Sequence, residues 1–123
     1  MLRRMTTSAP VLSPRRRQST GCSVTAVAPD LSVERATALS ILAKALGDPT
    51  RLQIVDVVRK SAPEAVCQCE LVPLFSMSQA GLAKHLKVLV DAGILASERR
   101  GTWTYYYTRP GGTEDLTSWL SLS

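Results

Sequence analysis

The sequence predicts a mainly α-helical domain that carries one β-hairpin near its C-terminal end. Between residues 33 and 93, apolar residues recur every three or four positions, which is the spacing of helices with one buried face. The stretch 102–108, TWTYYYT, is instead dense in aromatic and β-branched residues, which favour strands. Because the chain has 123 residues, it has room for one such domain and a tail. The expected order is four helices, two strands and a final helix.

The tail is residues 1–30, which we expect to form a disordered basic arm before a folded domain of residues 31–123. It is rich in Ser, Thr, Pro and Arg and has no periodic apolar pattern. Five arginines stand before position 30 without any acidic residue, whereas the rest of the chain carries ten basic and ten acidic residues. Such an arm can add sequence-independent attraction to phosphate. A solvated tail with no binding role fits the same composition.

We expect neither a membrane segment nor a secretory signal. No apolar run approaches the ~20 residues that a membrane-spanning helix needs. The segment before Cys22 lacks the apolar stretch and small-residue cleavage site of a secretory signal. We therefore expect a cytoplasmic protein whose three cysteines are reduced. In that compartment a cysteine cluster points to metal binding or redox sensing rather than to a structural disulfide.

Capping residues indicate where the first helices begin. Ser32 can cap a helix over 33–46. Asp48 can cap a second helix over 49–61, since a proline at the first position lacks only an N–H that would be unpaired anyway. A short third helix is expected over 66–74. The stripes of helical spacing on the first two helices are Leu39, Leu42, Ala43 and Leu46, and then Leu52, Val55, Val58 and Arg59.

The fourth helix is the best-defined amphipathic segment. It begins near Ser78 and ends at Gly93, which supplies a left-handed stop. A tight break at 75–77 joins it to the third helix, and two helices joined in this way are typical of a DNA-reading helix-turn-helix. The expected core face consists of Ser78, Leu82, Leu86 and Leu89, and the opposite face of Ala80, Lys84, Lys87 and Asp91.

A hairpin and one more helix complete the predicted domain. Arg100-Gly101 is a two-residue X-Gly turn of the kind that favours a tight hairpin within 94–108. Residues 110–112 end the second strand, and Thr113 can cap the final helix. A helix-turn-helix followed by a hairpin wing is a winged helix-turn-helix.

The fourth helix and the hairpin carry the residues that we expect to bind DNA, and the alternative is an ordinary surface helix with a solvated face. The N-terminus of a helix offers N–H groups to phosphate, Gln can pair with adenine, and Lys can reach guanine or phosphate. Two arginines at a hairpin tip can enter a minor groove or clamp phosphate. The histidine fits a DNA-backbone contact and a satisfied, partly buried side chain equally well. The candidates are Ser78, Gln79, Lys84, His85, Lys87, Arg99 and Arg100.

The cysteines are candidate ligands for a metal or metalloid ion. Cys67 and Cys69 have C-x-C spacing, and on an ideal helix such positions point about 200° apart. One ion can then bind both thiols only by distorting the start of the helix, which is what a switch requires. Cys22 is the candidate third ligand, and three soft thiolates suit a thiophilic ion of low coordination number. The alternatives are two small buried side chains and an exposed tail cysteine.

Four motifs in order resemble the ArsR/SmtB family of metal-responsive repressors. They are LGDPTRLQIV at 46–55, VCQCEL at 66–71, SMSQAGLAKHLKVLVDAGIL at 76–95 and RRGTWTYYY at 99–107. The resemblance covers about residues 33–109. The VCQCEL motif is similar to the thiol box on the third helix of arsenic- and cadmium-sensing members.

The resemblance implies a homodimeric repressor that binds double-stranded operator DNA and leaves it when As(III) or Sb(III) binds the thiolates. Cys67 and Cys69 would be ligands, but Val72 stands where arsenite-sensing members have a third cysteine, so Cys22 remains the candidate. Cd(II) or Pb(II) is the alternative inducer, because such sensors add thiols from an N-terminal arm. The final helix has no histidine for a zinc site and is short, so dimerisation is expected to rely more on 33–46.

Two other functions stay open. The thiols could sense oxidation instead of a metal while the domain still binds DNA. Alternatively, the domain could serve as a thiol buffer or as a surface that binds a partner protein. An enzyme is not expected, because one histidine without a paired catalytic group or a phosphate-binding loop offers little chemistry.

Overall fold

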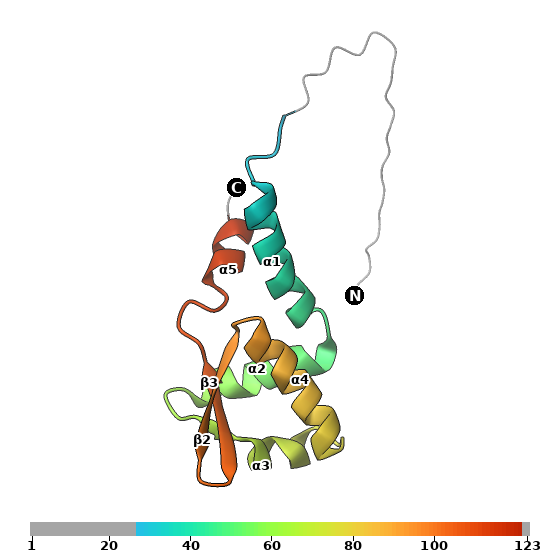
Figure 1. The fold of residues 1–123 in the computed structure, drawn as a ribbon, viewed down its shortest axis with the longest axis vertical. Helices are drawn as coiled ribbons and strands as arrows, with labels where there is room; N and C mark the ends of the chain where they lie inside the picture. Colours follow the sequence, from blue (N-terminus) through green and yellow to red (C-terminus); the bar gives the residue numbers. More distant parts are fainter. Residues whose placement is uncertain (1–26, 122–123) are drawn as a thin grey trace. The chain divides into compact units, whose positions relative to one another are not determined.

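The computed structural model describes residues 27–121, and a compact unit begins at Leu31. Most of the predicted arm, including Cys22, lies outside the described residues. None of the helices in the described part is long and apolar enough to cross a membrane. The elements are α1 (Val33–Leu46), α2 (Pro49–Ser61), β1 (Val66–Cys67), α3 (Gln68–Leu71), the 3-10 turn η2 (Val72–Leu74), α4 (Gln79–Asp91), β2 (Leu95–Arg100), β3 (Trp103–Thr108) and α5 (Glu114–Leu120) (Figure 1).

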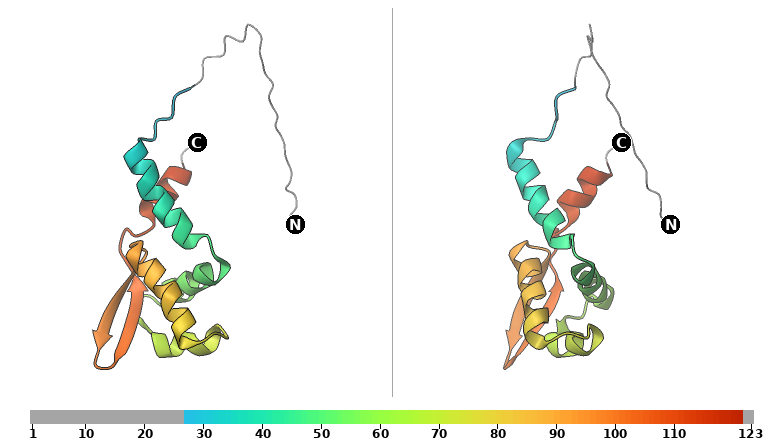
Figure 2. Two further views of the ribbon diagram at one scale, coloured as in Figure 1. Left: turned by 45° about the vertical axis from the view of Figure 1, so that its right-hand side comes forward. Right: turned by 90° about the vertical axis from the view of Figure 1, so that its right-hand side faces the viewer.

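The predicted winged helix-turn-helix is confirmed. Helices α1 and α5 pack together at one end, whereas the β2–β3 hairpin and α3 lie at the other (Figures 1 and 2). The predicted caps hold α1 and α2: the Ser32 Oγ accepts a hydrogen bond from the N–H of Arg35, and an Asp48 carboxylate oxygen accepts one from the N–H of Arg51. The cap expected at Thr113 makes no side-chain hydrogen bond to α5.

The expected third helix over 66–74 is wrong in detail. Its first two residues form strand β1, which leaves four residues for α3 and three for η2. Val66 pairs with Tyr106 and Cys67 with Tyr105, so the sheet has three antiparallel strands in the order β1-β3-β2. The strand was missed because two residues show no period, and their pairing partners lie about 40 positions away.

The hairpin turn lies one residue beyond the predicted Arg100-Gly101. Arg100 pairs with Trp103, so the turn residues are Gly101 and Thr102. Gly101 has a φ of +65°, which glycine adopts without a steric penalty. Because side chains alternate across a strand, this register places Arg99 and Arg100 on opposite faces of the wing.

The helix-turn-helix is built as predicted around the turn at 75–77. Ser76 has a φ of +46°, which turns the chain between η2 and α4. The Ser78 Oγ then accepts a hydrogen bond from the N–H of Gly81 at 3.0 Å and caps α4. Gly93, with a φ of +80°, ends the helical path as expected.

The core forms around α4, whose Leu82, Leu86 and Leu89 are all fully buried as predicted. The faces of the first two helices differ from the prediction. In α2 the core receives Ile54 beside Val58, while Leu52 is 52% exposed, because Ile54 and Val58 lie one turn apart on the side that meets α4 and β3. In α1 the buried residues are Leu39, as predicted, and Ala45 instead of Ala43, which is exposed; in α4 Ser78 is an exposed cap.

Replacing Leu86 by Ala should destabilise the domain by about 3 kcal/mol, because the cavity left in a close-packed core adds to the lost burial. Val88→Ala is the matched control, since Val88 lies on the same helix but is 39% exposed, and its cost should stay below about 1 kcal/mol. The free energy of unfolding in urea measures both. Equal losses for the two variants would contradict the assigned orientation of α4.

Candidate nucleic-acid interface and thiol site

Helix α4 presents an exposed basic face. Lys84 and Lys87 lie three positions apart, about 60° from each other around the helix, and both are exposed. The Lys87 Nζ lies 3.0 Å from the Asp91 carboxylate, and both side chains are mostly in solvent. Because such surface pairs contribute about 0–1 kcal/mol, a phosphate can replace the carboxylate at little cost.

The N-terminal end of α4 carries two more predicted residues. The Ser78 Oγ is engaged as the helix cap, which uses it as an acceptor and leaves its O–H able to donate. Gln79 is the first residue of the helix and is exposed. Both side chains therefore lie where the phosphate backbone or a base edge of DNA could contact them.

His85 is turned away from this face and is held by other helices. Its Nδ1 lies 3.2 Å from an Arg51 guanidinium nitrogen and 4.0 Å from the Asp48 carboxylate. An arginine always donates, so the imidazole accepts at Nδ1 and carries its proton on Nε2. Two positions along a helix, Lys87 points about 160° away. The structure therefore favours the satisfied, partly buried histidine over a direct DNA contact.

Arg51 is a residue that the sequence analysis missed. Its guanidinium donates hydrogen bonds to the carbonyl oxygens of Ala45, at 2.6 Å, and Lys44, at 3.3 Å, at the end of α1. Together with the contact to His85, these bonds join α1, α2 and α4. The backbone N–H of Arg51 holds the pKa of Asp48 below its usual value, with help from the positive charge of Arg51. Its place after an N-cap and a proline gave no sign of these distant partners.

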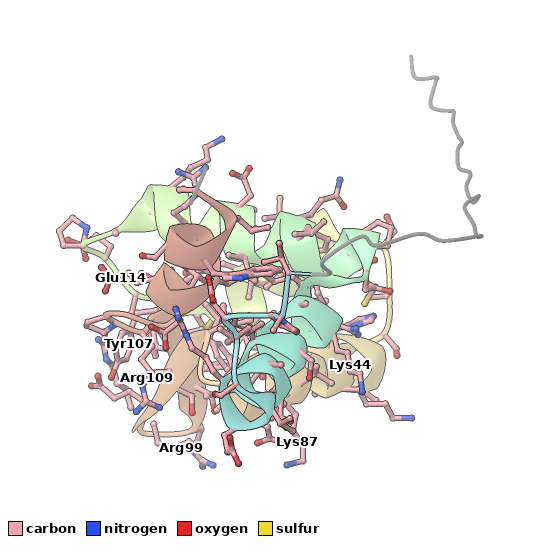
Figure 3. The ribbon with its side chains drawn as sticks, turned by 90° about the horizontal axis from the view of Figure 1, so that it is seen from above. Lys44, Lys87, Arg99, Tyr107, Arg109 and Glu114 are labelled. Carbon is pink, nitrogen blue, oxygen red and sulfur yellow. A yellow bond between two sulfur atoms is a disulfide. The ribbon has the colours of Figure 1, made fainter. Side chains whose placement is uncertain are left out.

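The two wing arginines have different surroundings. Arg99 is exposed and lies on the face of the hairpin that carries Ser97, and Ser97 lines a hollow together with Lys87. Figure 3 shows Lys87 and Arg99 projecting toward the same side of the molecule. Arg100 lies on the other face, where its Nε is 3.1 Å from the Glu98 carboxylate and its guanidinium is 4.4 Å from the centroid of the Tyr105 ring.

Cys67 and Cys69 are brought together and form a disulfide. The expectation that they point about 200° apart is wrong, because Cys67 is not helical: it ends β1 and is the N-cap of α3, with φ −69° and ψ 141°. Its N–H donates to the Glu70 carboxylate at 2.8 Å, and the N–H of Cys69 lies 3.2 Å from its sulfur. Cys67 is 2% exposed and Cys69 is exposed.

The sulfur pair meets part of the requirement for a thiophilic ion. Reduction of the disulfide yields two soft donors side by side, without the helix distortion that the sequence suggested. Within residues 27–121 no group of three His, Cys, Asp or Glu residues could hold a metal ion. The predicted third donor, Cys22, lies outside this part.

Comparison with known proteins identifies the family. Residues 48–97 match the model of the bacterial regulatory proteins of the arsR family. The chain is 32% identical over 84 residues to the arsenical resistance operon repressor of Staphylococcus aureus, which covers 68% of this chain and 78% of that protein. The chain belongs to the ArsR family. Membership confirms the predicted resemblance and the expectation of a regulatory protein rather than an enzyme.

Two further proteins show the extent of the likeness. The arsenical resistance operon repressor of Bacillus subtilis is 40% identical over 63 residues, which are 51% of this chain and 58% of that protein. The chain thus spans little more than half the length of this relative. A homodimeric winged helix-turn-helix domain from Mycobacterium bovis, described as that of a possible ArsR-family regulator, has a TM-score of 0.61. At 21% identity over 78% of this chain and 86% of that one, it supports the fold alone.

Proposed function

We propose that this ArsR-family chain is a transcriptional repressor that binds operator DNA as a dimer and leaves it when As(III) binds cysteine thiolates. The observation that carries the proposal is a single domain with a basic face shared by α4 and the wing and with two adjoining sulfurs beside the wing strand. Sb(III) has the same preference for thiolates, and Cd(II) or Pb(II) is the alternative inducer.

The DNA-binding surface is the exposed side of α4 together with the wing, which carries Arg99 on the face shared with Ser97 and Arg100 on the opposite face next to the turn. Lys84, Lys87 and Arg99 supply positive charge, and Lys87 and Arg99 project to the same side (Figure 3). Ser78 and Gln79 stand at the positive end of the α4 dipole, where a phosphate is favoured. His85 contributes indirectly by fixing α4 to Arg51.

A second copy of the chain is the proposed occupant of the surface formed by α1 and α5. Helix α1 exposes Val33 and Ile41, and α5 exposes Trp119 and Leu120. These two helices pack together at the end opposite the wing (Figure 2). A dimer formed there leaves the basic face of α4 and the wing free in each copy. Such a dimer presents two reading helices to a dyad operator. The description of the M. bovis domain as homodimeric supports a dimer of this chain.

Replacing Lys87 or Arg99 by Ala should weaken binding to an operator duplex selected from a random library. Each lost phosphate contact should lower the slope of log K against log salt by about 1. Lys60→Ala, a change at an exposed lysine on α2, is the matched control and should bind as the parent does. Fluorescence anisotropy measures affinity, and the endpoint should show two chains per duplex. Equal losses for all three variants, or one chain per duplex, would contradict the proposed surface or the dimer.

The inducer site consists of Cys67 and Cys69 with Cys22 as the third thiol. The chemistry is a ligand exchange in which each thiol replaces one hydroxide of As(OH)3: an As–S bond forms, an As–O bond breaks, and one water leaves. The disulfide must first take up two electrons and two protons from cellular thiols, since only the reduced pair can bind. The relatives named for arsenical resistance support arsenic as the first choice.

Arsenite should weaken operator binding by the reduced protein about 5–150-fold, as expected for a coupling of about 1–3 kcal/mol. Cys67→Ser and Cys69→Ser should bind DNA as the parent does and no longer respond, because one remaining thiol of the pair cannot chelate the ion. Cys22→Ser should raise the arsenite concentration needed. Anisotropy titrations with and without arsenite measure all three. An unchanged response in Cys22→Ser would remove this residue from the site, and equal parent affinities in both titrations would refute metalloid release.

A second function, oxidation sensing, is favoured by the disulfide between Cys67 and Cys69. In this case a peroxide accepts two electrons from the thiol pair and is reduced to water or an alcohol, and DNA affinity changes without a metal. Peroxide should then release the reduced protein from its operator, and a thiol reductant should restore binding. Full binding by the oxidised form would eliminate this function.

A further inference from the structure

The thiol pair is joined to the wing by the backbone pairing of β1 with β3. Cys67 lies directly opposite Tyr105, which in turn lies opposite Glu98 on β2. Residues opposite each other in antiparallel strands have their side chains on the same face, with Cβ atoms about 4.5–5.5 Å apart. The side chains of Cys67, Tyr105 and Glu98 therefore form one row across the three strands.

That row ends at a candidate DNA-binding arginine. The Arg100 guanidinium lies over the Tyr105 ring at 4.4 Å from its centroid, and its Nε is 3.1 Å from the Glu98 carboxylate. A long exposed side chain otherwise samples many rotamers, so the ring and the carboxylate restrict where the charge of Arg100 stands. Tyr105 is thus in direct register with the buried cysteine and in contact with the wing arginine.

A second row of side chains reaches the thiol pair from the wing face that carries Ser97 and Arg99. Val66 pairs with Tyr106, and the buried Tyr106 hydroxyl lies 3.5 Å from the Oε1 of Gln68, the residue between the two cysteines. Burial raises the pKa of Tyr106, so this hydroxyl stays protonated and able to donate. Helix α3 itself packs mainly against β1, β3 and η2. One of these neighbours, β3, is a strand of the wing, so α3 contacts the wing directly while its Leu71 lies in the core.

We propose that the thiol pair controls DNA binding through the wing, with Tyr105 as the positioning residue that couples Cys67 to Arg100. This inference rests on the proposed function and differs from the sequence-based expectation that an ion binds both thiols by distorting the start of the third helix. When the bonding partner of the Cys67 sulfur changes, as from hydrogen to arsenic, Cys67 moves relative to Tyr105, with which it pairs in the β1–β3 ladder. The Tyr105 ring under Arg100 then shifts, so Arg100 loses its contact with a DNA phosphate. Helix α4 keeps its packing in the core.

Tryptophan fluorescence tests the motion of the wing without DNA. The chain has two tryptophans, Trp103 on β3 and Trp119 on α5. In the reduced Trp119→Phe protein, arsenite should shift the emission of Trp103 and saturate with the thiolate–arsenic absorbance, whereas the Trp103→Phe protein should show no shift. Cys67→Ser should abolish the change. Saturating absorbance with unchanged Trp103 emission would overturn the inference and leave the proposed function intact. No absorbance change at all would overturn both.

Operator binding tests the role of Tyr105. Tyr105→Leu removes the ring under Arg100, and we expect it to weaken binding by the same factor as Arg100→Ala, about 3- to 10-fold, with no further loss in the double variant. It should also reduce the ratio of affinities measured without and with arsenite. Tyr105→Phe keeps the ring and should retain both the affinity and the ratio. A parent-like ratio in Tyr105→Leu would show that the thiols act by another route and would refute the inference.

Discussion

The pairing of two residues of β1 with the wing strand β3 is the constraint on which the rest of this structure depends. It keeps Cys67 extended, so that this residue ends a strand and caps α3 at once. The change of backbone conformation at that point directs the sulfurs of Cys67 and Cys69 toward each other. The same pairing places the sulfurs in register with Tyr105 and so with the wing. Two of the proposed thiol ligands thereby share a sheet with the wing that is proposed to bind DNA.

The reading helix is fixed by a separate set of interactions. Leu82, Leu86 and Leu89 anchor α4 in the core, and Arg51 ties His85 to the end of α1. These contacts join α4 to α1, the helix that is proposed to form the dimer. In the proposed dimer, the packing of the two α1 helices therefore sets the distance between the two α4 helices. The wing has no such anchor at its tip. Under the proposed function, α4 can therefore keep its contact with a DNA groove while the wing changes its contact with the adjacent DNA backbone.

The sequence predicts what is local and misses what depends on distant partners. Ser32, Asp48 and Ser78 are capping residues followed by helical spacing, and each helix begins where its cap indicates. Strand β1 has no such local signal, since its two residues are extended only because β3 pairs with them. The predicted turn was one residue too early, because the same glycine can be the second residue of an X-Gly turn or the first of a Gly-X turn. The reach of Arg51 across three helices has no counterpart in any local pattern.

Hydrogen exchange of the reduced protein, with and without arsenite and in the absence of DNA, tests the central claim most directly. If the thiols act on the wing, arsenite should change the exchange of backbone amides in residues 66–67 and 103–108, which form the β1–β3 ladder. Amides of α4, residues 79–91, should keep their protection. A change confined to α4, with the ladder unaffected, would contradict the account.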